Sequence, residues 1–323
     1  MHNPADPRLW QGREDKEAGD ALRWHQRITP WNGGDDLANA TTLLGFACDE
    51  GVQRNQGRSG AHKGPAEIRR ALANCAYFQK ASSYDAGDVV CSNQDLEQAH
   101  RMLVTQVSHI LHRNGHAIIL GGGHEMAWGN YLGLADYLQT TAPERRIGII
   151  NFDAHFDLRS PAPHATSGTP FRQIAEWCDD NIRAFNYMVL GINPAANTSA
   201  LFDYAKQRRI KWHNDVDCTL DNIKHLKRSM KTFLEKIDEL YLTICMDVFP
   251  AHSAPGVSAP SALGVDPIVV IKLIQWLKSL CESHAITWRL SDIAEVNPVY
   301  DIDNRTSKLA ARLIHELTAP QTT

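Results

Sequence analysis

Short apolar runs alternate with amphipathic stretches along most of this chain. Short continuous apolar runs are typical of strands buried on both faces, and the amphipathic stretches between them are typical of helices. We expect strands over Thr41–Cys48, His116–Leu120, Arg146–Phe152, Tyr187–Ile192, Tyr241–Val248 and Ile286–Leu290. We expect helices over Gly64–Asn74, Asp95–Arg113, Phe171–Trp177, Ser199–Arg208, His225–Lys236 and Asp266–Ser279. This alternation predicts an α/β fold with three α/β/α layers around a mostly parallel sheet.

The first part of the chain differs from the rest. Residues 1–40 are rich in polar residues, glycine, proline and tryptophan, and we expect an N-terminal arm that packs on the body through Trp10, Trp24 and Trp31. The chain shows no internal repeat, low-complexity tract or linker that would mark a second domain. We therefore expect one domain over residues 1–323, a length that large α/β domains reach.

Composition excludes several classes of protein. Hydrophobic residues make up 43% of the chain and charged residues 22%, as in globular proteins with a sizeable core. The net charge of −4 comes without a basic cluster, which argues against a nucleic-acid partner, and no apolar run is long enough to cross a membrane. The seven cysteines are scattered and form no CxxC pair, which favours free thiols in a reducing, cytoplasmic compartment.

Two segments directly follow expected strands and carry candidate metal ligands. The first is Asn151–Asp157, in which Asp153, His155 and Asp157 would project to one side if the strand continued. In the second, three glycines precede His124 and Glu125. These glycines could form a simple turn or a phosphate loop rather than part of a metal site, but a phosphate loop would continue with Lys-Ser/Thr. Carboxylates mixed with imidazoles are suited to hard divalent cations such as Mn²⁺, so we expect a metal-dependent enzyme.

Two further strands end in acids. The strand that begins at Tyr241 leads to Asp247 and then to the segment APGVSAP at residues 254–260. The last expected strand leads to residues 292–298, which contain Glu295 in the sequence EVNP. Because ligands of open α/β folds sit at the carboxyl ends of the strands, we expect these acids to lie near the candidate metal ligands.

The segments GGGHE, DAHFD and EVNP, in this order along the chain, resemble the ureohydrolase family of arginases, agmatinases and formimidoylglutamases. The resemblance runs from about Leu43 to Leu317 and implies an arginase-like fold. Arginases and agmatinases usually carry Gly-Gly-Asp-His where this chain has GGGH, and His-Gly-x-Pro where it has Ser167-Gly-Thr-Pro. These variants, with the early segment GVQRNQGRSGA and with APGVSAP, resemble the formimidoylglutamase branch.

The resemblance implies a binuclear Mn²⁺ site. Five of the family's six ligand positions are matched by His124, Asp153, His155, Asp157 and Asp247. The sixth, usually a bridging aspartate, is Cys245. This cysteine could bind as a thiolate, select a softer metal, weaken one site or act as a redox-sensitive position. It could equally be a small buried strand residue that leaves the second site poorly occupied.

The activity implied by the resemblance is hydrolysis of N-formimidoyl-L-glutamate to L-glutamate and formamide in histidine degradation, by metal-activated hydroxide. Asp157 would pass a proton to the leaving amine, and Glu295 would pair with the cationic formimidoyl group. Arg58 and Arg159, with Arg54 behind them, are candidates for binding the substrate carboxylates. Two alternatives remain open: hydrolysis of agmatine or arginine, and a metal-weakened homologue with a binding role. A homo-oligomer is possible.

Overall fold

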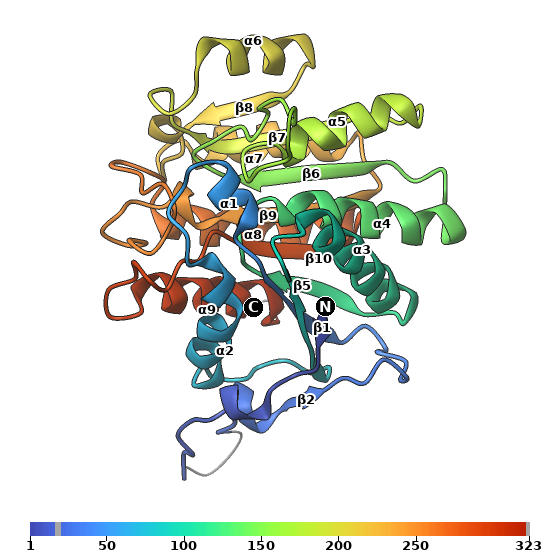
Figure 1. Cartoon of the computed structure of the whole chain (residues 1–323), viewed down its shortest axis with the longest axis vertical. Coiled ribbons are helices and arrows are strands. Elements are labelled where there is room, and N and C mark those ends of the chain that lie inside the picture. The colour runs from blue at the N-terminus through green and yellow to red at the C-terminus, as the bar shows by residue number, and fades with distance from the viewer. Residues whose placement is uncertain (17–20, 321–323) are drawn as a thin grey trace.

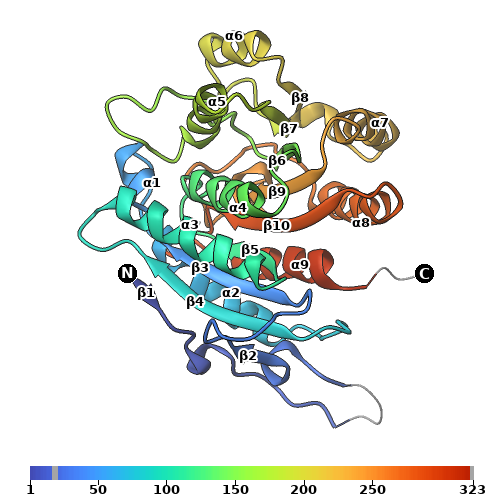
Figure 2. The same cartoon turned by 90° about the vertical axis from the view of Figure 1, so that its right-hand side faces the viewer.

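A mostly parallel sheet forms the centre of the molecule. The computed structural model describes residues 1–16 and 21–320. Within them the strands are β1 (His2–Asn3), β2 (Ile28–Pro30), β3 (Thr41–Ala47), β4 (Ser83–Val90), β5 (His116–Leu120), β6 (Ile147–Phe152), β7 (Asn186–Ile192), β8 (Lys211–Asn214), β9 (Glu239–Cys245) and β10 (Thr287–Ala294). They lie in the order β1-β4-β3-β5-β10-β9-β6-β7-β8, and β2 also pairs with β4 (Figure 1 and Figure 2). Of these pairings, β1 with β4 is antiparallel and the others are parallel.

Helices cover both faces of the sheet. One face carries α2 (Gly64–Ala73), α7 (Ile223–Leu234), α8 (Pro267–Ser283) and α9 (Arg305–Thr318), and the other carries α3 (Leu96–His112), α4 (Met126–Thr141) and α5 (Pro170–Asp180) (Figure 2). The short helix α1 (Glu50–Arg54) follows β3, and α6 (Ser199–Gln207) lies beyond β8. The two hydrophobic clusters of the core correspond to these two faces. The predicted three-layer α/β/α fold is confirmed.

Local sequence explains where several helices begin. The Asp95 side chain accepts a hydrogen bond from the Gln98 backbone N–H at 2.8 Å and caps α3. Asp266 caps α8 in the same way, through the Ile268 N–H at 2.8 Å, and Pro267 occupies the first turn, where no N–H is needed. All six expected helices are present, and their ends differ from the prediction by a few residues at most.

Some expected boundaries were wrong. The strand expected over Tyr241–Val248 ends at Cys245, because Met246–Val248 form a 3₁₀ turn. The strand expected to end at Leu290 continues as β10 to Ala294, since its second half pairs with both β5 and β9. Strands β4 and β8 and helices α4 and α9 were not anticipated.

The N-terminal arm lies against the first strands of the sheet. Strands β1 and β2 both pair with β4, and the Trp10 indole N–H donates to Asp85 Oδ2 at 2.7 Å. Trp24 is 1% exposed in the core beneath α2 and α9, and Trp31 is buried in the core beneath α3. The contacts expected of the three tryptophans are thus present. Residues 17–20 of the arm lie outside the described residues, and the single-domain organisation stays a prediction.

Candidate metal centre

Four adjacent strands bring the candidate ligands together. In the sheet, β5, β10, β9 and β6 are consecutive neighbours, and all four run parallel. His124 follows β5, Glu295 follows β10, Cys245 ends β9 just before Asp247, and Asp153 directly follows β6. Parallel strands end at the same edge of a sheet, so segments far apart in the sequence deliver their side chains to one place.

The side chains of Asp153, His155 and Asp157 converge, but not through a continued strand as the sequence suggested. Strand β6 ends at Phe152, so the three residues do not share one strand face. Instead the chain turns, and Asp157 adopts a left-handed backbone with φ 48°. The Asp153 carboxylate fixes this turn by accepting the His155 N–H at 2.7 Å.

Short contacts link the imidazoles to the carboxylates. His124 Nδ1 lies 2.9 Å from Asp153 Oδ2 and 2.9 Å from Asp157 Oδ2. His155 Nδ1 lies 3.1 Å from Asp247 Oδ2 and 3.6 Å from Asp153 Oδ1. Asp153 therefore stands between the two histidines, with one carboxylate oxygen toward each.

The glycines before His124 allow close approach of neighbouring backbone. A Cβ on Gly122 would lie 2.4 Å from both Phe46 O and Cys48 O, and one on Gly121 would lie 2.3 Å from Ile293 O. The Glu295 N–H donates to Gly122 O at 2.8 Å, which ties the end of β10 to this segment. The glycines are needed because side chains at these positions would collide with these carbonyls.

A buried hydrogen-bond network orients His124. Its Nε2 lies 2.9 Å from Thr243 Oγ1, and that hydroxyl donates to Asp292 Oδ1 at 2.7 Å. Thr243 and Asp292 are partners in the register of β9 and β10, and both are 0% exposed. Asn130 and Tyr241 donate to the other oxygen of Asp292. A ring proton on Nε2 leaves the Nδ1 lone pair directed at the carboxylates, which is the arrangement of a metal-ligating histidine.

The donor atoms fit metal ions. The described residues contain two groups whose potential ligand atoms lie within 4.8 Å of one another: His124, Asp153 and Cys245 form one, and Asp153, His155 and Asp247 form the other. His124 Nδ1 and Asp247 Oδ1 are buried and make no hydrogen bond within the described part of the chain. Lone pairs facing carboxylates repel unless a proton or a cation lies between them. The six candidate ligands are brought together, and their roles remain proposals.

The charges of the ligand group depend strongly on one another. Burial raises the pKa of Asp157 to about 6, and the neighbouring Asp153 carboxylate adds to this. Burial opposes ionisation of Asp153 too, but the neighbouring His124 and His155 imidazoles hold its pKa below the usual value. Burial also opposes charging of the His124 ring, yet Asp153 and Asp157 raise its pKa well above the usual value. The cluster thus favours positive charge at its centre.

Two glutamates lie beside the ligands. Glu295 is 4% exposed; its Oε1 accepts the His124 N–H at 3.0 Å, and its Oε2 has no hydrogen-bond partner among the described residues. Burial, reinforced by the charges of Glu125 and Asp247, raises the Glu295 pKa well above the usual value. Burial raises the pKa of Glu125 to about 7, and its Oε1 accepts the Gly51 N–H at 3.0 Å. A buried carboxyl with a free oxygen is suited to a cationic group of a ligand.

A cavity of about 300 Å³ opens onto the centre. Of the sequence-predicted residues, it is lined by His124, His155, Asp157, Cys245, Asp247, Glu295, Arg58 and Arg159. Asp153 lies beneath it, 0% exposed. The cavity also has polar lining residues that sequence reasoning did not select: Asn55, Gln56, Ser167, Asn197 and Ser258.

The three candidate arginines differ in position. Arg159 lines the cavity, and within residues 1–16 and 21–320 its guanidinium has no ion pair or hydrogen bond. Arg58 also lines it, but its guanidinium donates to the Val257 and Ser258 carbonyls and stacks on Tyr300 at 4.1 Å. Arg54 pairs with Glu50 at 3.0 Å and with Glu97 at 2.7 Å, and it is not among the lining residues. Arg58 and Arg54 are thus engaged by other parts of the protein, whereas the Arg159 guanidinium faces the cavity without a partner among the described residues.

One of these unselected residues, Asn55, was within reach of sequence reasoning, whereas another, Asn197, was not. Asn55 lies between the two arginines chosen from the GVQRNQGRSGA segment, and its Nδ2 donates to Ser167 Oγ at 3.2 Å. Asn197 gave no signal in the sequence, since it enters the cavity from the loop after β7. Its Oδ1 accepts the Phe156 N–H at 3.0 Å and so supports the turn that carries His155 and Asp157.

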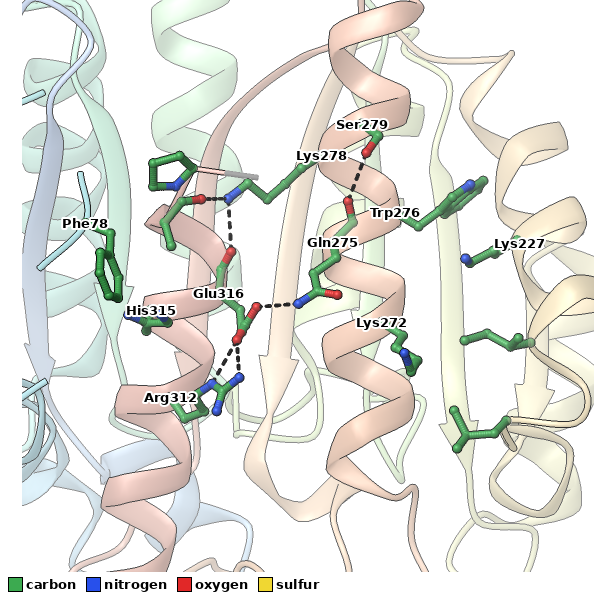
Figure 3. Close-up of a pocket in the computed structure, with 14 residues that line it drawn as sticks. Phe78, Lys227, Lys272, Gln275, Trp276, Lys278, Ser279, Arg312, His315 and Glu316 are labelled. Atoms are coloured by element: carbon green, nitrogen blue, oxygen red, sulfur yellow. Dashed lines mark hydrogen bonds and ion pairs between the residues drawn. The ribbon is translucent and has the colours of Figure 1, made fainter. Parts of the chain in front are cut away.

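A larger cavity, of about 1110 Å³, lies among α7, α8 and α9 (Figure 3). Its acidic residue, Glu316, already accepts hydrogen bonds from Gln275 and Arg312. The Lys278 ammonium donates to the backbone carbonyls of Glu316 and Ala319. Because the carboxylate and this cation are already engaged, the larger cavity does not present the ligand chemistry of the smaller one.

The fold and the site together define a three-layer α/β protein with two adjoining histidine–carboxylate positions at the carboxyl edge of its sheet. The chain belongs to the arginase family, whose model matches residues 39–319. It is 48% identical to the formimidoylglutamase of Ralstonia nicotianae over 97% of this chain and 95% of that protein. The resemblance to the ureohydrolase family is therefore confirmed.

Solved structures show the same fold. A formimidoylglutamase from Bacillus subtilis is similar with a TM-score of 0.79 and 25% identity, over 95% of this chain and 94% of that one. A formiminoglutamase from Trypanosoma cruzi, solved with Mn²⁺, has a TM-score of 0.74 and 23% identity, over 89% of this chain and 96% of that one. At that identity the second likeness shows the fold alone. None of the helices in the described residues is long and apolar enough to cross a bilayer.

Proposed function

We propose that this chain is a metal-dependent formimidoylglutamase, which hydrolyses N-formimidoyl-L-glutamate to L-glutamate and formamide in histidine degradation. The observation that carries the proposal is one cavity that presents two candidate metal positions, a carboxyl oxygen of Glu295 and the guanidinium of Arg159, and the last two groups have no partner among the described residues. The relative from Ralstonia nicotianae, which bears the name of this activity, supports the choice of substrate.

Two divalent metal ions are the proposed cofactors, and Mn²⁺ is the ion that the family resemblance implies. His124, Asp153, Asp157 and Cys245 would hold one ion, and Asp153, His155 and Asp247 the other. The related Trypanosoma cruzi enzyme was solved with Mn²⁺, which supports this metal for the family's centre. When bound, a metal pair supplies hydroxide near neutral pH by lowering the pKa of water, and it steadies the charge that develops during hydrolysis.

The formimidoyl group would bind at Glu295. This group is an amidinium, planar and positively charged, with N–H donors directed away from its carbon. The free Oε2 of Glu295 would accept one of these donors, and the positive charge would favour the ionised carboxylate at this buried position. The amidinium carbon is thereby held over the candidate metal positions, because Glu295 Oε1 is tied to the His124 backbone at 3.0 Å.

Hydrolysis breaks the bond between the formimidoyl carbon and the glutamate nitrogen. The oxygen of water bonds to the formimidoyl carbon, and this part of the substrate is released as formamide. A proton from water goes to the nitrogen, which becomes the amine of glutamate. Asp157 is the proposed carrier of this proton, since its carboxylate lines the cavity beside the candidate metal positions. In this chain Ser167 lines the cavity at the position where arginases have a histidine, and it provides no imidazole for proton transfer.

The glutamate end of the substrate would be held by Arg159. Its guanidinium is exposed at the mouth of the cavity, and two parallel hydrogen bonds to a carboxylate suit its planar geometry. This cation disfavours agmatine, which has an ammonium group and no carboxylate at this end. It also disfavours arginine, whose single carboxylate lies beside an ammonium group. Cytoplasmic location and a homo-oligomeric state stay predictions.

The proposal is tested by incubating the manganese-loaded protein with N-formimidoyl-L-glutamate and following the products by proton NMR. We expect glutamate and formamide in equal amounts. Glu295→Gln keeps the shape of the side chain and removes its charge, so we expect turnover to fall by about a hundredfold or more. Intact substrate with the natural chain would favour the alternative of a metal-weakened homologue.

A further inference from the structure

The two candidate metal positions are chemically unlike. One offers the imidazole of His124, carboxylate oxygens of Asp153 and Asp157, and the sulfur of Cys245. The other offers only oxygen and nitrogen, from Asp153, His155 and Asp247. Asp153 is common to both, so the positions adjoin. A sulfur atom in one of two adjoining sites changes which ion that site prefers.

Cys245 does not have the surroundings of an ordinary core cysteine. It is 1% exposed at the end of β9, and its Sγ lies within 4.8 Å of ligand atoms of His124 and Asp153. A structural cysteine would pack among apolar side chains, whereas this one faces acids and an imidazole. A bound cation is the group that makes these neighbours compatible.

We propose that Cys245 binds metal through Sγ, and that the position it shares with His124, Asp153 and Asp157 prefers a thiophilic divalent ion such as Zn²⁺ to Mn²⁺. Thiolate is a soft ligand that favours zinc, and four ligands from sulfur, nitrogen and oxygen suit tetrahedral zinc. The adjoining position, which has hard ligands, keeps its preference for Mn²⁺. This inference rests on the metal-dependent site of the proposed function and specifies which ions it takes.

Metal binding by Cys245 has a defined balance. The Sγ–H bond breaks, the sulfur keeps its electron pair and donates it to the ion, and the proton goes to the buffer. No oxidant or reductant is needed. Zinc binding to the natural chain should therefore release more protons than zinc binding to Cys245→Ala.

The direct test is optical. Metal-free protein is titrated with Co²⁺, which replaces Zn²⁺ and shows a thiolate-to-cobalt charge-transfer band in the near ultraviolet when sulfur is bound. We expect this band in the natural chain and its loss in Cys245→Ser and Cys245→Asp. Cys281→Ser is the matched control, because Cys281 is a buried free thiol on α8, away from the centre, and its removal should leave the band unchanged. A natural chain that binds Co²⁺ without the band would overturn the proposal.

A second measurement tests the preference itself. Metal-free natural chain and Cys245→Asp are each equilibrated with equal Zn²⁺ and Mn²⁺, and the bound metals are counted by mass spectrometry after desalting. We expect the ratio of bound zinc to manganese to be at least about tenfold higher in the natural chain. Equal ratios would refute the preference. Neither measurement uses turnover, so a band without hydrolysis would reject only the proposed reaction, and hydrolysis without a band would reject only this inference.

Discussion

Replacing Thr243 with valine should weaken metal binding at His124 without changing the shape of the site. The Thr243 hydroxyl lies 2.9 Å from His124 Nε2 and donates to Asp292 at 2.7 Å. With a metal on Nδ1, the ring proton must be on Nε2, and the valine variant gives it no acceptor. In the metal-free protein the proton can move to Nδ1, where the Asp153 and Asp157 carboxylates lie 2.9 Å away. The loss therefore falls mainly on the metal-bound state.

The size of the effect follows from burial. His124 is 1% exposed and Thr243 is 0% exposed, so water has no access to replace the missing hydroxyl. An unsatisfied buried donor costs about 1–3 kcal/mol. Because about 1.4 kcal/mol corresponds to a tenfold change in a binding constant, this predicts a metal affinity lower by roughly 5- to 150-fold. Losses of about 10- to 100-fold are typical when the group behind a metal-binding histidine is removed.

The assay is calorimetric titration of metal-free protein with Mn²⁺, which measures each binding constant directly. Thr243→Ser keeps the hydroxyl and should restore most of the affinity. Ser291→Ala removes a hydroxyl from the neighbouring position of β10, where it accepts the Trp288 indole N–H at 2.9 Å, and should leave the affinity as it is. If Thr243→Val binds Mn²⁺ as tightly as the natural chain, the account of His124 is wrong.

Three further predictions concern binding and stability. Arg159→Ala should raise KM for formimidoylglutamate by roughly tenfold or more with little change in kcat, because it removes a charged hydrogen-bond donor for the substrate carboxylate, and steady-state kinetics would show this. Arg69→Met should lower the free energy of unfolding by about 3–5 kcal/mol in urea denaturation, since Arg69 and its partner Asp85 are each 1% exposed and the acid would stay buried without its cation. Burial lowers the pKa of His100 from 6.5 to about 4, so the unfolded chain takes up this proton first as the pH falls. Between pH 7 and pH 4 the free energy of unfolding of the natural chain should therefore fall by roughly 2–3 kcal/mol more than that of His100→Leu. An equal fall in the two proteins would refute this.

Periodicity predicted the elements whose burial is regular and missed those that depend on partners distant in sequence. Helix α4 was not anticipated because it is buried on most sides and contains Gly129 and Gly133. A Cβ at these positions would lie 2.9 Å from Leu103 Cδ2 and 2.7 Å from Val107 Cβ of α3. The glycines that weaken the helical pattern therefore allow the two helices to pack closely.

Strand β4 was missed for a similar reason. Its sequence SYDAGDVV has two acids and a glycine, which are typical of a loop. In the structure Asp85 and Asp88 accept hydrogen bonds from Arg69 of α2, and Gly87 adopts a positive φ of 78°. The ion pairs that allow this strand to be buried join residues on different elements, and no local pattern reveals them.

The candidate ligand segments could be located from the sequence because each follows a recognisable strand. Strand order was not predictable, since it depends on how β5, β10, β9 and β6 pair across more than 150 residues of chain. The network of Thr243 and Asp292 follows from that pairing and so was not foreseen. Among the arginines, only the structure distinguished Arg159 from Arg58 and Arg54. The Arg159 guanidinium has no partner in the part of the chain that the structure describes, whereas the other two are engaged by other parts of the protein.

The most direct test of the proposed function is a comparison of substrates. The manganese-loaded natural chain would be assayed with N-formimidoyl-L-glutamate, agmatine and arginine, and kcat/KM measured for each. The arrangement of Glu295 and Arg159 predicts that the formimidoyl substrate is hydrolysed with the highest kcat/KM. A higher value for agmatine or arginine, or no hydrolysis of any of the three, would contradict it.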